Sequence, residues 1–357
     1  MRKIALMLLT ILLLSGLAGC KQNVTPPSTS NEETNEKPEK GKTATRISDY
    51  YPYRKDTLMS YAGEGNEYAE QKVYFEYIKD GRAQMKITTP GTDVVKVVEY
   101  KNGELREIYS EGEFYHFENI IDVQGTLSDI ILKEPIKVGM SWALNDGSKR
   151  TITGSDVRID TPYKEYKALE VTTELGDNRK QMDYYVAGVG LVARIYKDGE
   201  IEIKTLLEKV EEDKALVSRI RFYYPSKEDI KTLYTERDIE FRTGDRIEKI
   251  FEESFKNPPS DKLASPIPQN TKINSIKLDR ANGIVRVDFS KELITEMNSG
   301  SAWETEMLKS LVNTFGSYYM VEKVYISTDG EPYSSGHFAI RGNEYFTVDD
   351  KNVEELK

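Results

Sequence analysis

The chain has 357 residues, of which 38% are hydrophobic, 31% charged and 10% aromatic, and its formal net charge is −10. This length predicts two domains, each with its own core, and the aromatic content excludes a chain that is disordered throughout. The acidic balance excludes a typical nucleic-acid-binding protein, whose affinity comes largely from Lys and Arg on phosphates.

The first twenty residues have the pattern of a secretory signal. A basic start, Met1-Arg2-Lys3, precedes an apolar run, Ile4–Leu14, that is too short to cross a bilayer comfortably. The sequence Leu17-Ala18-Gly19-Cys20 that follows resembles a bacterial lipobox. The resemblance implies removal of residues 1–19, lipid attachment to Cys20, and a place on the outer face of the cytoplasmic membrane. The alternative is an ordinary secreted protein in which this cysteine is incidental.

Cys20 is the only cysteine, which limits the chemistry of the mature chain. Internal disulfides, thiol catalysis and thiolate metal sites are excluded. Loss of Arg2 and Lys3 with the signal leaves 48 basic against 60 acidic residues, so the charge becomes −12. Residues 20–46 are polar and rich in Pro, Ser, Thr and Glu, and we expect a disordered tether because they cannot bury enough apolar surface to offset the entropy of ordering.

Residues 47–213 are expected to form an antiparallel β-rich domain, curved into a half-barrel or closed into a sandwich. Asp80-Gly81, Asn102-Gly103 and Asp198-Gly199 each separate two strand-like runs, as hairpin turns do. About Asn102-Gly103, the register would place Lys101 opposite Glu104 and Glu99 opposite Arg106. Further strand candidates, rich in Val, Tyr and Thr, are Val94–Tyr100, Lys164–Thr173 and Gln181–Val186.

Residues 214–357 change to a mixed pattern centred on a hairpin at Asn282-Gly283. A two-residue type I′ turn there would give one apolar face and one charged face. The expected cross-strand pairs are Leu278 with Val287, Ile276 with Phe289, Lys277 with Asp288 and Asp279 with Arg286.

Two amphipathic helices flank this hairpin. Thr243 would cap the first, which ends before Pro258, and Ser301 with Glu304 would form a capping box for the second, which ends at Gly316. Strands at Leu216–Tyr224 and Val321–Ser327 complete the order, with a short edge hairpin at 338–340 and 345–348. The class is therefore α+β, with a split β-α-β-β-α-β layer whose helices cover one face of a sheet.

Residues 216–340 resemble the GerMN domain of the spore germination and sporulation family. The resemblance is carried by Pro266-Ile267-Pro268-Gln269-Asn270-Thr271, Asn282–Ser290, Leu293, Ser301, Glu304, Val312-Asn313-Thr314, Val324 and Asp329-Gly330. It implies a membrane-anchored extracytoplasmic lipoprotein with a ring-building-like fold that is used for assembly.

The sequence contains few histidines that could serve in catalysis or metal binding. His116 and His337 are the only two histidines and cannot make a His-rich zinc site. We expect His116 to be a packed or surface residue on a strand. Ser335 and His337 are too close in sequence to face one another as nucleophile and base, so a loop is expected there.

Other candidate groups have ordinary interpretations. The acidic runs Glu252-Glu253 and Asp349-Asp350 are typical of solvated faces, and there is no glycine-rich phosphate loop. The pairs Tyr223-Tyr224 and Tyr318-Tyr319 could form a recognition patch, although half-buried aromatics are commoner. We therefore expect no catalytic, cofactor-binding or metal-binding residues, and Cys20 as the lipid-attachment site.

These observations favour a non-enzymatic, lipid-anchored assembly or interaction protein of a Gram-positive envelope, linked to sporulation or germination. The expected partners are the membrane, through the lipid, and a protein partner or second copy, through the GerMN-like domain. The alternative is a β-rich carrier of a lipid or small ligand; a large apolar cavity would favour it, and a filled core would favour assembly. A cell-wall hydrolase would need an acidic pair in a cleft.

Overall fold

The computed structural model describes residues 46–298 and 300–357, which belong to one compact unit. The predicted signal peptide, Cys20 and all but the last residue of the predicted tether lie outside the described residues. The large-sheet region comprises residues 47–211, and the α/β region comprises residues 216–355.

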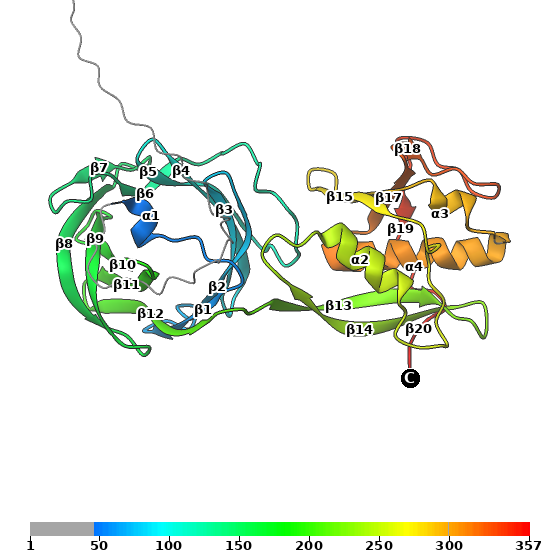
Figure 1. Cartoon of the computed structure of the whole chain (residues 1–357), viewed down its shortest axis with the longest axis horizontal. Helices are drawn as coiled ribbons and strands as arrows, with labels where there is room; N and C mark the ends of the chain where they lie inside the picture. The colour runs from blue at the N-terminus through cyan, green and yellow to red at the C-terminus, as the bar shows by residue number, and fades with distance from the viewer. Residues whose placement is uncertain (1–45, 299) are drawn as a thin grey trace, which may run out of the picture. The chain divides into compact units, whose positions relative to one another are not determined.

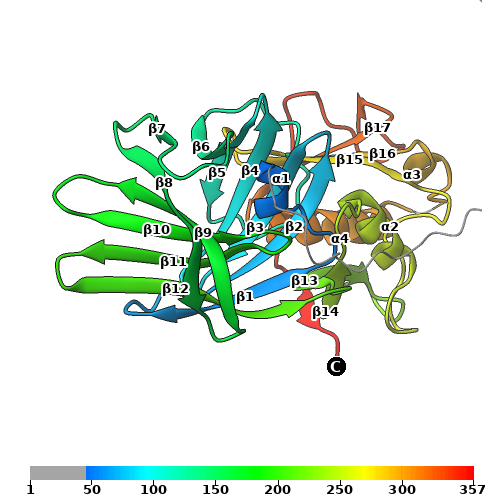
Figure 2. The ribbon, with the colours of Figure 1, turned by 60° about the vertical axis from the view of Figure 1, so that its left-hand side comes forward.

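The large-sheet region is one antiparallel sheet of twelve strands in the order β6-β5-β4-β3-β2-β1-β12-β11-β10-β9-β8-β7. It curls until it is almost closed (Figures 1 and 2), so of the two expected forms the curved sheet is found and the sandwich is not. The strands are β1 (Leu58–Glu64), β2 (Gln71–Lys79), β3 (Arg82–Thr88), β4 (Asp93–Lys101), β5 (Glu104–Gly112), β6 (Asp129–Lys133), β7 (Ser141–Ala143), β8 (Lys149–Asp160), β9 (Glu165–Glu174), β10 (Lys180–Val186), β11 (Gly190–Asp198) and β12 (Ile201–Glu211).

Two of the predicted turns have the predicted form. Asp80-Gly81 and Asn102-Gly103 all have positive φ, as a type I′ turn requires. Lys101 lies opposite Glu104 and Glu99 opposite Arg106, as expected. The third turn is one residue later than predicted: Asp198 pairs with Ile201, so the turn residues are Gly199 and Glu200, of which Gly199 has φ 57°.

The first and last strands of the large sheet, β1 and β12, are neighbours, so the open edges are β6 and β7. Two side chains connect these edges. The indole Nε1 of Trp142 in β7 donates to the carbonyl oxygen of Ile130 in β6 at 2.9 Å, and Nη1 of Arg150 in β8 donates to the same oxygen at 2.6 Å. We call these two hydrogen bonds the β6–β7 seam.

A short helix that the sequence reasoning missed, α1 (Ile47–Tyr50), lies inside the curled sheet (Figure 1). Ile47 is 2% exposed, and the carbonyl oxygen of Asp49 accepts a hydrogen bond from Gly188 N at 2.7 Å. The hydroxyls of Tyr100 and Tyr53 donate to the carbonyls of Tyr51 and Gly81. The helix is only four residues long and has no amphipathic period, so it is held by these tertiary contacts.

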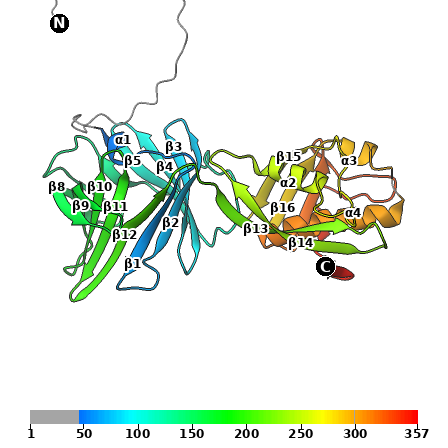
Figure 3. The ribbon, with the colours of Figure 1, turned by 60° about the horizontal axis from the view of Figure 1, so that its bottom comes forward.

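The α/β region has two sheets with helices between them (Figures 1 and 3). One sheet has the order β13-β14-β20, and the other has the order β15-β16-β17-β18 with β19 beside β17. The elements are β13 (Leu216–Pro225), β14 (Thr232–Phe241), α2 (Ile247–Lys256), β15 (Ile273–Asp279), β16 (Ile284–Phe289), α3 (Glu292–Thr295), α4 (Ser301–Tyr319), β17 (Lys323–Thr328), β18 (Glu331–Pro332), β19 (Phe346–Thr347) and β20 (Val353–Glu355).

The predicted strands and helices are present in the predicted order, and β14 and the four-residue helix α3 are added to them. The strand at 216–225 forms a hairpin with β14, which was not predicted, and lies in a sheet separate from β15–β17. Helix α4 is therefore buried on more than one side: Leu311 and Phe315 are fully buried, and the Thr314 hydroxyl accepts a hydrogen bond from Tyr223 N in β13 at 3.0 Å.

The central hairpin has the predicted faces but not the predicted register. Val285, Val287 and Phe289 are fully buried, whereas Lys277 and Arg286 are exposed. Asp279 pairs with Ile284, so the loop has four residues, 280–283, instead of two. The cause is local: the Asp279 carboxylate accepts hydrogen bonds from Asn282 N at 3.2 Å and from its amide group.

That shift moves each partner by two positions, which keeps the faces and changes the pairs. Ile276 faces Val287, Leu278 faces Val285, and Lys277 faces Arg286. The predicted pairing of Lys277 with Asp288 is therefore wrong. Asp279 and Arg286 still meet, diagonally, with 3.7 Å between Oδ2 and Nη2.

The predicted helix ends are also corrected. Arg246, not Thr243, precedes α2, and Gly300 precedes α4; neither makes a side-chain cap. The predicted box partner Glu304 is buried and accepts a hydrogen bond from the Tyr333 hydroxyl at 2.6 Å. Helix α4 continues through Gly316, where a Cβ would come within 2.3 Å of Val348 Cγ2, and ends at Tyr319 before Met320 in the left-handed region.

At the C-terminal end, the predicted strand at 345–348 is found as β19, but 338–340 does not pair with it. Ala339 forms an isolated bridge with Ser334 instead.

The two regions contact one another through the turn after β14. Thr243 Oγ1 donates to Phe75 O in β2 at 2.7 Å, and Asp56 Oδ1 accepts from Thr243 N at 2.8 Å. The Phe117 ring, from the loop after β5, stacks on Phe241 with centroids 3.8 Å apart. Thr243 is thus used in joining the regions, which explains why it does not cap α2.

Candidate functional site

The curled sheet surrounds a partly open cavity of about 300 Å³ whose lining comes entirely from the large-sheet region and the residues after α1. The strands bring residues from far apart in the sequence to it. In β2, β3 and β10, alternate residues line it, because successive side chains point to opposite faces of a strand. The lining residues in these three strands are Gln71, Val73 and Phe75, then Met85 and Ile87, then Gln181, Asp183 and Tyr185.

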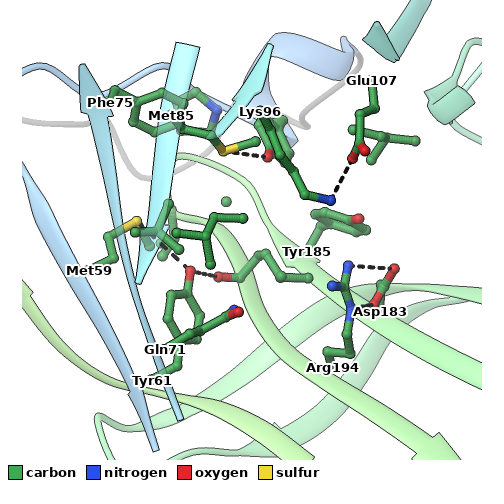
Figure 4. Close-up of a pocket in the computed structure, with 18 of the residues that line it drawn as sticks. Met59, Tyr61, Gln71, Phe75, Met85, Lys96, Glu107, Asp183, Tyr185 and Arg194 are labelled. Atoms are coloured by element: carbon green, nitrogen blue, oxygen red, sulfur yellow. Dashed lines mark hydrogen bonds and ion pairs between the residues drawn. The ribbon is translucent and has the colours of Figure 1, made fainter. Parts of the chain in front are cut away.

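One side of the cavity is apolar. Met59, Phe75 and Met85 lie together there (Figure 4). Tyr61 and Tyr51 add aromatic surface with one polar atom each: the Tyr61 hydroxyl donates to Leu191 O at 2.9 Å, and the Tyr51 hydroxyl contacts Met85 Sδ at 3.6 Å. Burial raises the pKa of both phenols, so they remain protonated hydrogen-bond donors at neutral pH.

The other side carries two ion pairs (Figure 4). Lys96 Nζ lies 2.8 Å from Glu107 Oε2, between β4 and β5. Arg194 in β11 binds Asp183 in β10 through Nε at 2.6 Å and Nη2 at 3.3 Å. Gln181 Nε2 donates to both oxygens of the same carboxylate, at 3.2 and 3.1 Å. Asp183 holds the pKa of the Arg194 guanidinium well above its ordinary value.

The exposure of the second pair shows that it faces open space. The Asp183 side chain is 3% exposed, whereas that of Arg194 is 40% exposed although the sheet surrounds it. A guanidinium in a packed core would be far less accessible, so Arg194 borders the cavity itself. Charges in an enclosed space are costly unless they are paired or hydrogen-bonded, and both pairs meet that requirement.

Two further charged residues line the cavity near the β6–β7 seam. Arg150 donates from Nε to Thr173 Oγ1 at 2.9 Å and from Nη1 to Ile130 O at 2.6 Å. Asp129, the first residue of β6, lies opposite Glu107 in the sheet. No carboxylate among the described residues forms an ion pair with Arg150, and no described partner binds the Asp129 side chain.

Of the predicted functional residues, Cys20 lies outside the described part of the chain. His116 is 5% exposed in the loop after β5, not on a strand as expected. His337 is exposed on a loop, where its backbone N–H donates to Ser335 Oγ at 3.1 Å. The loop interpretation of Ser335 and His337 therefore agrees with the structure.

The sequence suggested that Glu252 lies on a solvated face, but Glu252 is buried. Its buried carboxylate forms ion pairs with Lys256 at 2.9 Å and Lys249 at 3.1 Å, and it accepts a hydrogen bond from Ile273 N at 3.3 Å. The tyrosine pairs are not a surface patch either: Tyr223, Tyr224 and Tyr319 are buried. Within residues 46–298 and 300–357, no group of three His, Cys, Asp or Glu side chains is placed to hold a metal ion. None of the helices in these ranges is long and apolar enough to cross a membrane.

The cavity residues themselves were missed by the sequence reasoning. A signal was present: Lys96 interrupts the run Val94-Val95-Lys96-Val97-Val98, and Asp183 interrupts Met182-Asp183-Tyr184-Tyr185. A charged residue inside an apolar strand predicts polar or oppositely charged groups on the same face of the sheet. Its partner lies on the neighbouring strand of the same hairpin, where Asp183 is directly opposite Arg194, so identifying it requires the register of that hairpin.

Comparison with known proteins assigns part of the chain. Residues 221–334 match the family model Germane, described as sporulation and spore germination. This confirms the predicted resemblance of this part of the α/β region to the sporulation and spore germination family. No functionally curated protein matches the chain.

Among solved structures, the tandem GerMN domains of the sporulation protein GerM from Bacillus subtilis are 15% identical, with a TM-score of 0.27; the match covers 36% of this chain and 46% of that one. The first GerMN domain of the same protein is 14% identical, with a TM-score of 0.25, over 37% of this chain and 95% of that one. A Bacteroides fragilis protein inferred to be exported, with a YmcC-like fold, is 9% identical, with a TM-score of 0.29, over 46% of this chain and 99% of that one. Scores at this level support no conclusion about activity.

Proposed function

We propose that the large-sheet region binds a small amphipathic ligand and that the GerMN domain links this binding module to a protein partner in the cell envelope. The observation that carries the first part is the cavity, which has Met59, Phe75 and Met85 on one side and two ion pairs on the other. Binding, not catalysis, is proposed for both regions.

The size and lining of the cavity support ligand binding. A volume of about 300 Å³ lies at the lower end of the range for small-molecule sites, which are mostly apolar with a few convergent polar groups. This favours the carrier alternative for residues 47–213 over a region with a filled core.

The test uses residues 21–357 and the neutral fluorophore N-phenyl-1-naphthylamine, whose emission rises in apolar surroundings. We expect saturable binding to the parent protein and loss of binding in Val73→Phe, in which the larger ring occupies the cavity. Val217→Phe is the matched control, because Val217 in β13 is 52% exposed. No saturable binding, or equal binding by the Val73 variant, would contradict the proposal.

The location follows from the lipobox-like sequence and the polar segment after it. We propose that Cys20 carries the lipid and holds residues 47–357 outside the cytoplasmic membrane. A Cys20→Ala protein should fail to incorporate labelled fatty acid and should leave the membrane fraction. Normal labelling of that variant would refute the proposed anchor.

Assembly through the GerMN domain is the second candidate, and the arrangement of β15 favours it. Strand β15 is an edge of its sheet, and the open face beside it carries Lys277, Asp279, Arg286 and Asp288. An edge strand can extend a sheet into another subunit, and charges beside it can align with opposite charges on the partner. Asp288 is already bound by Ser327 Oγ at 2.7 Å and Gly330 N at 2.8 Å, which leaves Lys277 and Arg286 as the principal exposed charges.

Light scattering of residues 21–357 over a wide concentration range, at low and high salt, tests this candidate. We expect self-association, or capture of an envelope protein from native membranes, that weakens as salt rises. Lys277→Ser with Arg286→Ser should abolish it, and Arg219→Ser, on the exposed face of β13, serves as the control. A strictly monomeric protein that captures nothing would refute the assembly candidate and leave the ligand-binding proposal intact.

A further inference from the structure

The charges that line the cavity sum to zero but are not all neutralised locally. The cations are Lys96, Arg150 and Arg194, and the anions are Glu107, Asp129 and Asp183. Lys96 is paired with Glu107, and Arg194 with Asp183. One guanidinium, Arg150, and one carboxylate, Asp129, are left without an ion-pair partner among the described residues.

Arg150 is held in place by bonds that leave its charge free. Its two acceptors, Thr173 Oγ1 and Ile130 O, are both neutral. A guanidinium has five N–H donors in a planar fork, so donors remain for a carboxylate or another planar anion. The bonds to Thr173 and Ile130 fix the side chain across the β6–β7 seam and pre-orient those donors.

Asp129 has the opposite character. Its Cα partner across the sheet is Glu107, so two carboxylates stand side by side on neighbouring strands. Like charges directly opposite are destabilising, and Lys96 pairs only with Glu107. A cation beside Asp129 would relieve this repulsion.

We propose that the ligand is a small zwitterion with a short apolar body, whose negative group binds Arg150 and whose positive group binds Asp129. This inference rests on the proposed ligand-binding function. A singly charged ligand would pair with only one of these two side chains and would leave the other charge without a partner in a partly enclosed cavity. A zwitterion neutralises both remaining wall charges and keeps the total at zero.

A zwitterionic group has two possible sources, a phospholipid head group and a free small molecule. A zwitterionic phospholipid carries the same charges as a free small molecule, but a volume of about 300 Å³ lies at the lower end for small-molecule sites. The ligand is therefore a free zwitterion with one short apolar chain or ring, not a two-chain lipid.

Isothermal titration of residues 21–357 with four octyl probes tests the charge preference. The probes are N-octyl-N,N-dimethylglycine, nonanoate, octyltrimethylammonium and octanol, which differ in head group and share the octyl tail. We expect the zwitterion to bind at least about tenfold tighter than each of the other three, a difference of about 1.4 kcal/mol.

Two variants locate the charges. Arg150→Gln and Asp129→Asn should each weaken binding of the zwitterion by at least about tenfold. Arg158→Gln and Asp160→Asn, whose side chains at the far end of β8 are 70% and 76% exposed, are the matched controls and should bind like the parent. Asp129→Asn keeps the side-chain shape and removes no described hydrogen bond, so it remains decisive if Arg150→Gln disturbs the seam.

The outcomes distinguish this inference from the ligand-binding proposal. Binding of N-phenyl-1-naphthylamine without preference for the zwitterion, or without effect of either variant, would overturn the zwitterion and leave ligand binding standing. If the parent protein does not bind N-phenyl-1-naphthylamine, the ligand-binding proposal itself is overturned. A phospholipid adduct in native mass spectra, after incubation with phosphatidylethanolamine vesicles, would overturn the free zwitterion in favour of a membrane lipid.

Discussion

The interiors of the two regions are packed in opposite ways. The α/β region is filled with apolar side chains, among which Phe222, Phe251, Phe255, Phe289 and Phe315 are fully buried and their rings contact one another. The large-sheet region surrounds a cavity and places six charged side chains around it. A filled interior leaves the α/β region only its surface and sheet edges for recognition, whereas the large-sheet region can also bind internally.

The largest expected effect comes from disturbing the filled interior. Val287→Asp puts a carboxylate without a partner among fully buried side chains, and we expect the free energy of unfolding to fall by about 4 kcal/mol or more. Denaturant titration measures this. Asp279→Asn, on the open face of the same hairpin, should leave the midpoint nearly unchanged. Equal losses in the two variants would reverse the assignment of the faces.

That hairpin also shows how far the sequence predicts the fold. Alternation determined its faces correctly, because a residue's side of a strand depends only on parity. The register was wrong, because Asn282-Gly283 is the usual two-residue turn signal and the competing hydrogen bonds from Asn282 to the Asp279 carboxylate were not considered. Likewise, Thr243 looks like a helix cap, but its hydroxyl donates a hydrogen bond to the carbonyl oxygen of Phe75 in the other region.

The candidate site was less predictable than the fold. Its ion pairs join neighbouring strands, but the cavity exists only because twelve strands curl, and α1 lies inside them. Curvature depends on bulges such as those at Tyr61, Val98 and Tyr185 and on the β6–β7 seam, none of which has a local sequence signal. The resemblance to the GerMN family, by contrast, was recognised from contiguous motifs.

A second prediction compares the same substitution in the two interiors. Val285→Phe adds a ring to a fully packed site, and we expect it to lower the free energy of unfolding by about 1–3 kcal/mol. Val73→Phe adds the same ring beside the cavity and should cost less than about 1 kcal/mol, because space is already present. Titration of both variants in one denaturant decides the point. A cost for Val73→Phe that equals that of Val285→Phe would mean that the large-sheet interior is as full as the other.

A smaller, pH-dependent effect is expected where the two regions meet. Burial lowers the pKa of His116 below its ordinary value, although Glu118, 3.4 Å away, opposes this; Arg280 and Lys86 act with burial. The unfolded chain therefore takes up a proton near the ordinary value of 6.5 while the folded protein stays neutral. The stability due to neutral His116 is complete above that pH and is lost as pH falls through the lowered pKa.

Unfolding free energies between about pH 7.5 and about pH 5 measure this contribution. We expect the parent protein to lose stability on acidification across this range and His116→Phe to lose less. His337→Phe, on an exposed loop, is the matched control and should follow the parent. An identical pH dependence in the parent and in His116→Phe would show that the histidine at this junction does not link proton binding to folding.

The smallest predicted effect concerns the β6–β7 seam, where the large sheet differs most from the continuous ladders of the α/β region. Trp142→Phe keeps an aromatic ring in β7 and removes the hydrogen bond from the indole to Ile130 O, at a cost of about 0.5–1.5 kcal/mol. Arg150 still binds the same oxygen, so the edges should separate more often without unfolding the region. Amide hydrogen exchange should therefore accelerate in β6 and remain unchanged in β16. Trp303→Phe, in α4, is the control, and exchange in β6 that is equally slow in both variants would show that the indole hydrogen bond does not hold the seam.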